Sequence, residues 1–264
     1  MTGPAAHWDR PDLATAVLDA LAAAGRDLDG LTVESLAATD HFHGGGRPAT
    51  ERLAGLAAPG PGTEVLDVGG GLGGPARLLA ERFGCSVTVV DITPSYVEAA
   101  RELTARLGLA DRVRHELGDA LDLPFADASF DLVWTQNSGM NIADKAALYA
   151  GFRRVVRPGG MLAQQEPMAG PGGPPVYPVM WADDASSSFL WAPDELRALI
   201  EEAGFVARTW DDVTEEVQAP SAPAPAHSIQ RLVMGDRLEA IQAAGRRNAA
   251  EDRVRMVQAT FAAR

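Results

Sequence analysis

The stretch VLDVGGGLGGPARLLA, residues 65–80, decides the fold. It opens with a short apolar run typical of a buried strand, and five glycines follow between Gly69 and Gly74. The residues from Pro75 onward are predicted to form a helix, whose first turn tolerates a proline. Glycines let a ligand approach the backbone closely, and a helix N-terminus offers free N–H groups. The stretch therefore predicts a ligand-binding turn between a strand and a helix.

Two carboxylates indicate which ligand the turn binds. Gly69, Gly71 and Gly74 satisfy the dinucleotide pattern G-x-G-x-x-G, which is weak evidence alone because such a turn can simply pack tightly. Asp91 ends the next predicted strand, where a carboxylate accepts hydrogen bonds from the ribose of an adenosine. NAD and S-adenosylmethionine both carry an adenosine. Asp67, at the mouth of the turn, suits a cationic ammonium group and would repel a pyrophosphate.

The rest of the chain alternates strands and helices. Strands are predicted at residues 64–68, 86–91, 112–117, 130–135, 161–165, 205–210 and 254–261, and helices at 75–83, 94–107, 143–156, 193–203 and 228–248. Thr93 is placed to cap the helix that starts at Pro94, and Arg157-Pro-Gly-Gly160 is expected to be a turn. This alternation predicts an α/β fold with a mostly parallel, doubly wound sheet of seven strands and helices on both faces.

The flanking segments suggest an added helical layer. Helices are predicted at 12–24, 31–38 and 49–57, so residues 1–60 are expected to form an N-terminal helical cap or lid over a core of residues 61–264. An insertion around 168–192 is expected on the substrate side. The Pro/Ala-rich segment Gln218–His227 is predicted to be a surface linker.

Composition excludes several classes of protein. The 264 residues carry a formal net charge of −13, which argues against nucleic-acid or anionic-membrane binding. Cys85 is the only cysteine, so neither an intramolecular disulfide nor a cysteine-based zinc cluster is expected. No apolar run approaches the roughly 18 residues of a membrane span, and residues 1–12 lack the pattern of a signal peptide. We expect a cytoplasmic protein that could form a homodimer.

Beyond these features, the chain resembles the class I S-adenosylmethionine-dependent methyltransferases, in the small-molecule branch of sarcosine/dimethylglycine and sterol methyltransferase-like enzymes. The resemblance covers roughly residues 31–261 and implies a Rossmann-like methyltransferase fold. It rests on motifs in the family's order and spacing: VLDVGGGLGG at 65–74, VVDIT at 89–93, GDALDLPFADASFDLVWTQ at 118–136, MNIADK at 140–145 and RVVRPGGML at 154–162. It implies S-adenosyl-L-methionine as cofactor, S-adenosyl-L-homocysteine as product and a small molecule with an N, C or O nucleophile as acceptor, in specialised metabolism.

The resemblance also implies the residues that bind the cofactor. Asp67 would hold its amino group, Asp91 would bind the ribose, and Asp119 would accept a hydrogen bond from the adenine amino group. Gln136 would hold the methionine moiety or place the substrate, unless it is an ordinary loop amide. Further contacts would come from Gly69, Gly71 and Gly73 to the methionine part and from Ile92 and Ala120 to the adenine.

Candidate catalytic residues are harder to mark, because methyl transfer needs alignment of the nucleophile and only sometimes a base. His41 and His43 precede the core in DHFHGG, and similar methyltransferases fold a D-x-x-H-x-G-G segment over the cofactor; His43 matches its histidine. A histidine with an ordinary pKa near 6.5 can act as a base, although either ring could instead cap a helix or contact the cofactor. Glu166 could pair with a cationic amine, or it could face solvent. No metal site is expected, because no third ligand accompanies the two histidines.

The loops after the fourth and fifth strands are expected to form the substrate face, because open α/β sheets bind ligands at the carboxyl ends of their strands. Related sequences often carry a histidine where Asn137 stands, so a base at this position is in doubt. The residues nominated for substrate contact are Asn137, Met140, Asn141, Trp181, Asp184 and Phe189, although Met140 and Trp181 could be packing residues.

Two other functions compete with methyl transfer. An NAD-dependent oxidoreductase would share the glycine pattern and Asp91, but it would not explain Asp67, the Gly118-Asp119-Ala120 element or the Arg157–Gly160 turn. A non-methylating descendant, such as a cyclase, would keep S-adenosylmethionine only for structure or electrostatics.

Overall fold

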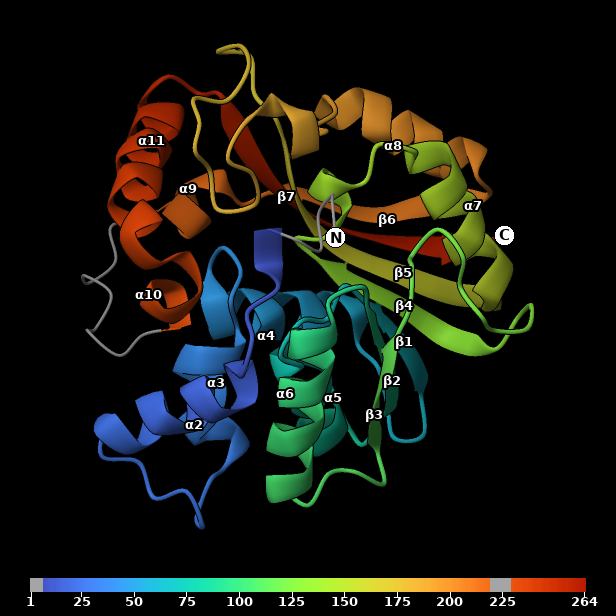
Figure 1. The fold of residues 1–264 in the computed structure, drawn as a ribbon. Coiled ribbons are helices and arrows are strands. Elements are labelled where there is room, and N and C mark those ends of the chain that lie inside the picture. The colour runs from blue at the N-terminus through green and yellow to red at the C-terminus, as the bar shows by residue number, and fades with distance from the viewer. Residues whose placement is uncertain (1–6, 219–228) are drawn as a thin grey trace.

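The computed structural model describes residues 7–218 and 229–264. A seven-stranded sheet runs through its centre in the order β3-β2-β1-β4-β5-β7-β6 (Figure 1). The strands are β1 (Glu64–Val68), β2 (Ser86–Asp91), β3 (Val113–Leu117), β4 (Phe130–Gln136), β5 (Val156–Ala169), β6 (Phe205–Asp212) and β7 (Val254–Ala263).

The strand directions confirm a mostly parallel sheet with one exception. β1 to β5 pair in parallel, whereas β7 lies antiparallel between β5 and β6. The strand order reverses between β1 and β4, which opens a crevice beyond the carboxyl ends of these strands. The crevice is where this type of fold binds its ligand.

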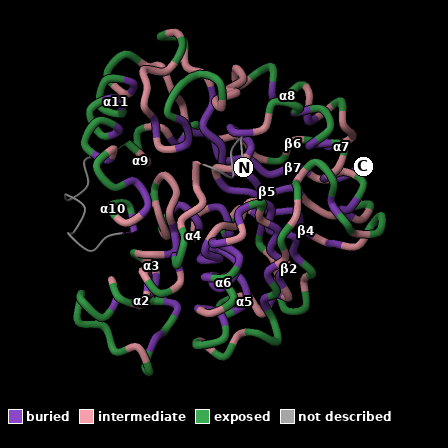
Figure 2. The backbone as a smooth tube through the Cα atoms, in the orientation of Figure 1, coloured by how far each residue is buried: buried purple, intermediate pink, exposed green. Residues whose placement is uncertain are grey.

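The helices cover both faces of the sheet because successive strand residues point to opposite sides. On one face, Val65 and Leu132 pack against α4 (Gly46–Ala57) and α5 (Gly74–Phe83). On the other, Leu66 and Val133 pack against α7 (Lys145–Val155) and α8 (Pro193–Glu202). Figure 2 shows the resulting buried layer along the strands.

The N-terminal helices α2 (Leu13–Ala23) and α3 (Val33–Asp40) pack together with helices from much later in the chain. Leu13 of α2 and Leu36 of α3 share an apolar cluster with residues of three other helices, α6 (Pro94–Arg106), α10 (Ile229–Met234) and α11 (Leu238–Ala250). Figure 1 shows α11, α10, α3 and α2 along the left side of the molecule, with α6 next to α2 and α3. The domain boundary at residue 60 stays a prediction.

The segment after β5 covers the loop that follows β4. This loop contains a 3-10 turn, η1 (Gly139–Asn141), and Met140 packs in an apolar cluster with Val179 and Trp181. A second 3-10 turn, η2 (Ala185–Ser187), lies in the same segment. Phe189 donates its N–H to the Met140 carbonyl at 2.8 Å. The predicted insertion therefore packs on the outer side of η1.

Some local expectations need correction. Thr93 occupies the N-cap position of α6, but its side chain makes no capping bond. The expected turn at residues 157–160 lies within β5, where it loops out as a bulge: Val156 pairs with Phe130 and the next paired residue is Met161. Of the predicted linker, only Gln218 is described, at the end of α9 (Thr214–Gln218), and the remainder lies outside the described residues. The predicted helix at 228–248 is interrupted by a 3-10 turn, η3 (Gly235–Arg237).

Candidate active site

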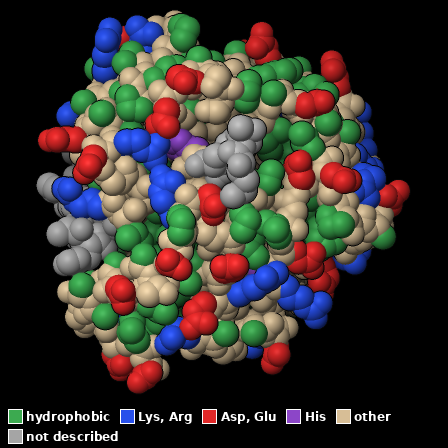
Figure 3. Space-filling model, in the orientation of Figure 1, with side chains coloured by type: hydrophobic (Ala, Val, Ile, Leu, Met, Phe, Trp, Pro, Cys, Tyr) green, Lys and Arg blue, Asp and Glu red, His purple; other side chains and the backbone are tan. Residues whose placement is uncertain are grey.

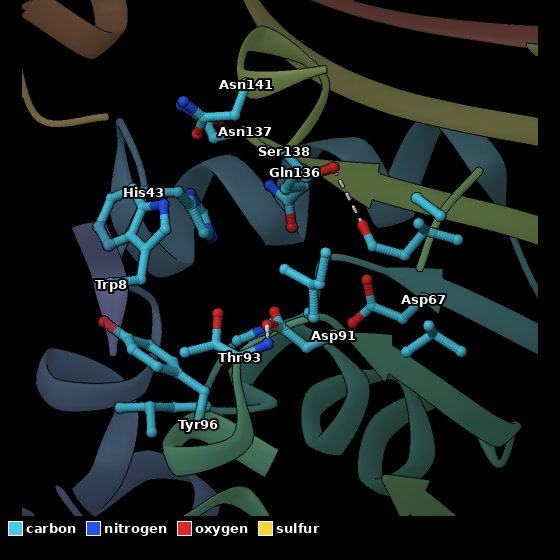
Figure 4. Close-up of a pocket in the computed structure, with 18 of the residues that line it drawn as sticks. Trp8, His43, Asp67, Asp91, Thr93, Tyr96, Gln136, Asn137, Ser138 and Asn141 are labelled. Atoms are coloured by element: carbon cyan, nitrogen blue, oxygen red, sulfur yellow. Dashed lines mark hydrogen bonds between the residues drawn. The ribbon is translucent and has the colours of Figure 1, made fainter. Parts of the chain in front are cut away.

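A pocket opens at the carboxyl ends of β1, β2 and β4 (Figure 4). The glycine turn after β1 forms its floor, and Trp8, Phe42 and His43 approach it from the N-terminal side. The lining residues are Trp8, Asp40, Phe42, His43, Asp67 to Leu72, Pro75, Val90 to Thr93, Tyr96, Gly118 to Ala120, Gln136 to Ser138, Asn141 and Ile142.

Close packing requires glycine at the start of this turn. Gly69 has a φ of 74°, and a Cβ atom there would lie 2.3 Å from the Cβ of Ser138. Its N–H donates to the Val90 carbonyl at 2.7 Å. A side chain at this position would therefore displace the loop after β4, which forms the opposite wall of the pocket.

Asp67 is a buried carboxylate without a partner. It lines the pocket, is 1% exposed, and accepts no hydrogen bond from a described residue. Burial, together with the nearby charge of Asp91, raises the pKa of Asp67 to about 8. A buried charge of this kind is unfavourable unless a cation pairs with it, so the site is suited to a positively charged ligand group.

Asp91 is held in a fixed orientation beside the glycine turn. Its Oδ2 accepts from the Gly71 N–H at 3.0 Å and its Oδ1 from the Thr93 N–H at 2.9 Å. Burial raises the pKa of Asp91 although these N–H groups act in the opposite direction. Each oxygen keeps a further lone pair, which could accept from a ligand hydroxyl.

The three residues predicted to contact adenine, Asp119, Ala120 and Ile92, all line the pocket. Asp119 lines it together with Gly118 and Ala120, and its Oδ1 accepts from the Leu121 N–H at 2.9 Å. Ile92 also lines the pocket and is 45% exposed. An exposed isoleucine beside an acceptor carboxylate provides an apolar surface and a polar edge for a planar ring.

Gln136 presents its amide nitrogen without a partner. Its Oε1 accepts from Trp134 Nε1 at 3.1 Å, and the Thr50 hydroxyl also lies at 3.1 Å from this atom. Because an indole nitrogen only donates, this contact fixes the orientation of the amide. Gln136 Nε2 is buried and makes no hydrogen bond to a described residue.

His43 lines the pocket, but both of its ring nitrogens have partners. Nδ1 lies 3.2 Å from the Gly44 carbonyl and Nε2 lies 3.0 Å from Thr50 Oγ1. Burial lowers the pKa of His43 to about 4. Since a carbonyl only accepts, the neutral ring carries its proton on Nδ1, and the single hydroxyl proton of Thr50 is shared between His43 Nε2 and Gln136 Oε1. The ring therefore holds Thr50 in place, and it is a weak base because its pKa is low.

His41 belongs to a buried ion-pair cluster next to the pocket. Its Nδ1 lies 2.8 Å from Asp40 Oδ1, and Asp40 Oδ2 accepts from Arg77 Nη2 at 2.8 Å. Burial acts to raise the pKa of Asp40, but His41 and Arg77 together hold it below its usual value. Arg77 also donates to the Leu72 carbonyl at 2.6 Å. This cluster joins the end of α3 to the glycine turn.

Gly73 packs on the same cluster and does not line the pocket. A Cβ at Gly73 would lie 2.6 Å from His115 Cε1 and 3.0 Å from Arg77 Nη1. His115, on β3, is bonded through Nε2 to Thr104 Oγ1 at 2.8 Å. Gly73 therefore makes room for buried side chains under the turn.

Glu166 lies behind η1 and not in the pocket. Its Oε1 accepts from the Gly139 N–H at 2.9 Å and from the Ser138 N–H at 3.3 Å. Lys145 donates to the carbonyls of Gly139 and Ile142 from the same side. Burial raises the pKa of Glu166 and lowers that of Lys145 to about 8. The two side chains together clamp the backbone of η1.

Two of the six predicted substrate residues line the pocket and the other four do not. Asn137 and Asn141 line the pocket, whereas Met140 and Phe189 line a small cavity beside Glu166. Trp181 is buried and lines neither. Asp184 is exposed and accepts from the Ser186 N–H at 2.8 Å.

Several pocket residues carry no sequence signal that marks them. Trp8 comes from the N-terminal region, far in sequence from the glycine turn. Thr50 of α4 does not line the pocket but contacts two residues that do, His43 and Gln136. Tyr96 lies in the first turn of α6, and its buried hydroxyl makes no hydrogen bond to a described residue. Phe42 stands between the two histidines already considered, so it could have been proposed on position alone.

The charged side chains of the described pocket lining are all acidic. Asp40, Asp67, Asp91 and Asp119 line it, and neither lysine nor arginine does. On the face shown in Figure 3, basic side chains lie among acidic ones. The described residues contain no cluster of three metal-ligating side chains and no helix long and apolar enough to span a membrane.

Comparison with known proteins agrees with this geometry. Residues 65–160 match the family described as "Methyltransferase domain". The methyltransferase GfsG of Streptomyces halstedii is 33% identical over 196 residues, which cover 72% of this chain and 70% of that protein. Several other curated methyltransferases align over only 21–42% of their own length.

Two solved structures share the fold. Geranyl diphosphate C-methyltransferase from Streptomyces coelicolor, in complex with S-adenosyl-L-homocysteine, superposes with a TM-score of 0.66 at 21% identity, covering 82% of this chain and 78% of that one. The [4+2]-cyclase SpnF superposes with a TM-score of 0.63 at 22% identity, covering 82% of this chain and 80% of that one.

The fold and the pocket define a Rossmann-like nucleotide-binding protein with an acidic cofactor site. The chain belongs to the S-adenosylmethionine-dependent methyltransferases of the small-molecule class. The predicted family, fold and cofactor are thereby confirmed, and the oxidoreductase alternative is not supported.

Proposed function

We propose that the protein transfers a methyl group from S-adenosyl-L-methionine to a small, uncharged acceptor in specialised metabolism. The observation that carries the proposal is the unpartnered carboxylate of Asp67 at the mouth of the glycine turn. A cationic ammonium group beside Asp67 would stabilise its ionised form, as the amino group of this cofactor would.

The remaining cofactor contacts follow from the donors and acceptors that line the pocket. Gln136 Nε2 would donate to the cofactor carboxylate, and Asp91 would accept from the ribose hydroxyls. Asp119 would accept from the adenine amino group, beside Ile92. When bound, S-adenosylmethionine supplies an electrophilic methyl group on its sulfonium.

The protein's own contribution on the acceptor side is alignment and exclusion of water. Trp8 and Phe42 provide apolar surface at the N-terminal side of the pocket. Of the three proposed catalytic residues, His43 is the one that lines the pocket, and it would order Thr50 and Gln136. Glu166 and His41 would act only through the segments that they hold.

The formal net charge of −13 supports an enzyme that does not bind nucleic acid. The cytoplasmic location stays a prediction. The homodimer stays a prediction, because nothing in a single chain addresses it.

Calorimetric titration with S-adenosylmethionine, with NAD in parallel, tests the proposal. We expect saturable binding of S-adenosylmethionine alone and release of S-adenosylhomocysteine with an acceptor. Because the pKa of Asp67 is about 8 in the free protein, binding near pH 7 should release up to one proton, and affinity should rise from about pH 6 to about pH 8.

The variant Asp67→Asn tests whether Asp67 itself binds the ammonium group of the cofactor. It should weaken binding by about tenfold or more, since a hydrogen bond to a charged group is worth about 1.5–3 kcal/mol, and it should abolish the proton release. Proton release that persists in Asp67→Asn would contradict the role of Asp67. Cofactor binding without methyl transfer to any acceptor, with a reaction that persists when a non-transferable analogue replaces the cofactor, would favour the non-methylating alternative.

A further inference from the structure

Three side-chain amides form a buried row that leads to the acceptor side of the pocket. Gln258 on β7 and Gln165 on β5 are paired residues of the sheet, and neither is exposed. Gln258 Nε2 donates to Gln165 Oε1 at 2.7 Å, and Gln165 Nε2 donates to Asn137 Oδ1 at 2.9 Å. Asn137 follows directly after β4 and lines the pocket.

The orientation of each amide in this row is fixed by neighbouring groups that can only donate or can only accept a hydrogen bond. Arg52 Nη1 donates to Gln258 Oε1 at 2.7 Å, and a guanidinium cannot accept. Gln258 Nε2 donates to the Ala49 carbonyl at 2.7 Å. Gln165 Nε2 likewise donates to the Gly44 carbonyl at 2.9 Å. Since no amide in the row can be reversed without losing such a bond, the assignment of oxygen and nitrogen follows from the network.

The row determines which atom Asn137 presents to the pocket. Its Oδ1 is used by Gln165, and its Nδ2 makes no hydrogen bond to a described residue. The backbone of Asn137 has a φ of 54°, a left-handed conformation that asparagine tolerates better than most residues. Asn137 therefore offers a hydrogen-bond donor to the pocket.

Asn141 offers the complementary group. Its Nδ2 donates to the Trp181 carbonyl at 2.9 Å and to the Ser187 carbonyl at 2.7 Å. These bonds use both amide hydrogens, and its Oδ1 makes no hydrogen bond to a described residue. Figure 4 shows Asn137 and Asn141 on the same side of the pocket, above His43. One asparagine thus supplies a donor and the other an acceptor.

We propose that the methyl acceptor is a neutral hydroxyl compound, bound between Asn137 Nδ2 and Asn141 Oδ1, and that Gln165, Gln258 and Arg52 are positioning residues for this pair. The inference rests on the proposed function and names the acceptor class for the same site. An oxygen nucleophile has two lone pairs, so one can accept from Asn137 while the other faces the methyl carbon. A neutral amine has one lone pair, which the Asn137 donor would occupy.

Both the charge of the pocket lining and the bonds made and broken in the transfer are consistent with a hydroxyl acceptor. The described lining contains no lysine or arginine to pair with a carboxylate or phosphate, and the residues outside the described ranges include neither lysine nor arginine. The oxygen–methyl bond forms as the sulfonium–methyl bond breaks, and the sulfur keeps that electron pair. The hydroxyl proton leaves to water, so the products are a methyl ether, S-adenosylhomocysteine and a proton.

The chain permits a direct test, because its only asparagines are Asn137, Asn141 and Asn248. Selective 15N-asparagine labelling of the full chain with S-adenosylhomocysteine bound should give three side-chain NH2 pairs in an NMR spectrum. Asn141 donates twice and Asn248 donates to the Val176 carbonyl at 2.9 Å. The Asn137 pair, assigned by its loss in Asn137→Asp, should exchange with water fastest of the three.

The variant Gln165→Glu should reverse the Asn137 amide. Measured at about pH 8, above the usual pKa of about 4.3 for glutamate, the new carboxylate can only accept, so Asn137 must turn its NH2 toward it. Exchange of the Asn137 pair should slow by about tenfold or more, as expected for a hydrogen bond to a charged group. Gln164→Glu is the matched control, since Gln164 is equally buried, faces the other side of the sheet and bonds Tyr149 at 2.8 Å.

The acceptor class is tested on the same samples with phenol, benzyl alcohol and cyclohexanol as probes. At least one should shift the Asn137 pair in the wild type and in Gln164→Glu, but not in Gln165→Glu. An Asn137 pair that exchanges slowly in the wild type, or that Gln165→Glu leaves unchanged, would overturn the inference. The inference would also be overturned if dimethylglycine or phosphoethanolamine shifted the Asn137 pair and none of the three hydroxyl compounds did.

Calorimetry separates this inference from the proposed function. If a folded sample does not bind S-adenosylmethionine, the proposed function fails. Suppose instead that the wild type binds the cofactor and that Gln165→Glu binds it with an affinity within about twofold of the wild type. If the exchange rates of the asparagine signals then contradict the predicted order, the assignment of the acceptor fails and the proposed function stands.

Discussion

The two halves of the pocket are built by different means. The cofactor half consists of a glycine turn and the carboxylates Asp67, Asp91 and Asp119, which lie within one run of the chain. The acceptor half is assembled from Phe42 and Thr50, the loop after β4, and glutamines on β5 and β7. Its described side chains are aromatic rings and neutral hydrogen-bonding groups.

The difference shows how one fold can keep its cofactor and change its acceptor. Under the proposed function, the carboxylates of the cofactor half would favour a cationic ligand that carries an adenosine. In the acceptor half, no ionisable group is needed for selection. A side-chain amide with a fixed orientation presents either a donor or an acceptor, and so favours a ligand with the complementary group. The following predictions test how independent the two halves are.

The largest effect is expected where the N-terminal helices meet the cofactor half. Arg77→Leu leaves Asp40 buried without its cation, which should destabilise the protein by about 3–5 kcal/mol. Urea unfolding measures this change. The matched control is Arg106→Leu, which removes an exposed pair with Glu102 and should cost no more than about 0.5 kcal/mol. Equal effects of the two variants would mean that the buried pair does not join the segments energetically.

A smaller effect, confined to the cofactor half, is expected from Asp91→Ala. The variant should weaken S-adenosylmethionine binding by at least about tenfold, because a hydrogen bond to a charged group contributes about 1.5–3 kcal/mol. Calorimetric titration measures it, with Asp127→Ala as an exposed carboxylate control. Unchanged affinity would refute the assignment of Asp91 to the ribose.

The smallest effect on cofactor binding is expected from His43→Ala, which tests the acceptor half. Loss of the ring releases Thr50, so kcat should fall several-fold while the affinity for S-adenosylmethionine stays within about twofold. With a pKa of about 4, His43 is neutral throughout the physiological range, so its titration should leave no inflection in kcat between about pH 6 and about pH 8. An inflection in that range that disappears in His43→Ala would show that the ring acts as a base in the complex.

The cofactor half could be predicted from the sequence because its residues form contiguous motifs. Asp67 lies near the end of β1, Gly69 follows β1 directly and Asp91 ends β2. The parallel pairing of β1 and β2 brings them together. The pocket lining includes all of the predicted cofactor residues except Gly73, whose space is taken by His115 and Arg77.

The acceptor half was only partly predictable. Asn137 and Asn141 were named because they follow β4, but nothing in the sequence shows which atom each presents. That depends on Gln165 and Gln258, which meet only because β7 lies beside β5. Glu166 was misplaced for a related reason: it follows Gln165 on β5, so its side chain points to the opposite face and meets Lys145 there.

The antiparallel placement of β7 between β5 and β6 has a consequence for how the chain acquires its activity during synthesis. The glycine turn, Asp91, Asp119 and Gln136 have all left the ribosome before the last strand is made. The acceptor side still lacks Gln258, so Gln165 Oε1 has not yet gained the donor that completes the row, and only the Gly44 carbonyl orients the Gln165 amide. A nascent chain would therefore be able to present its cofactor residues before the amide row behind Asn137 is complete, and β7 would complete that row.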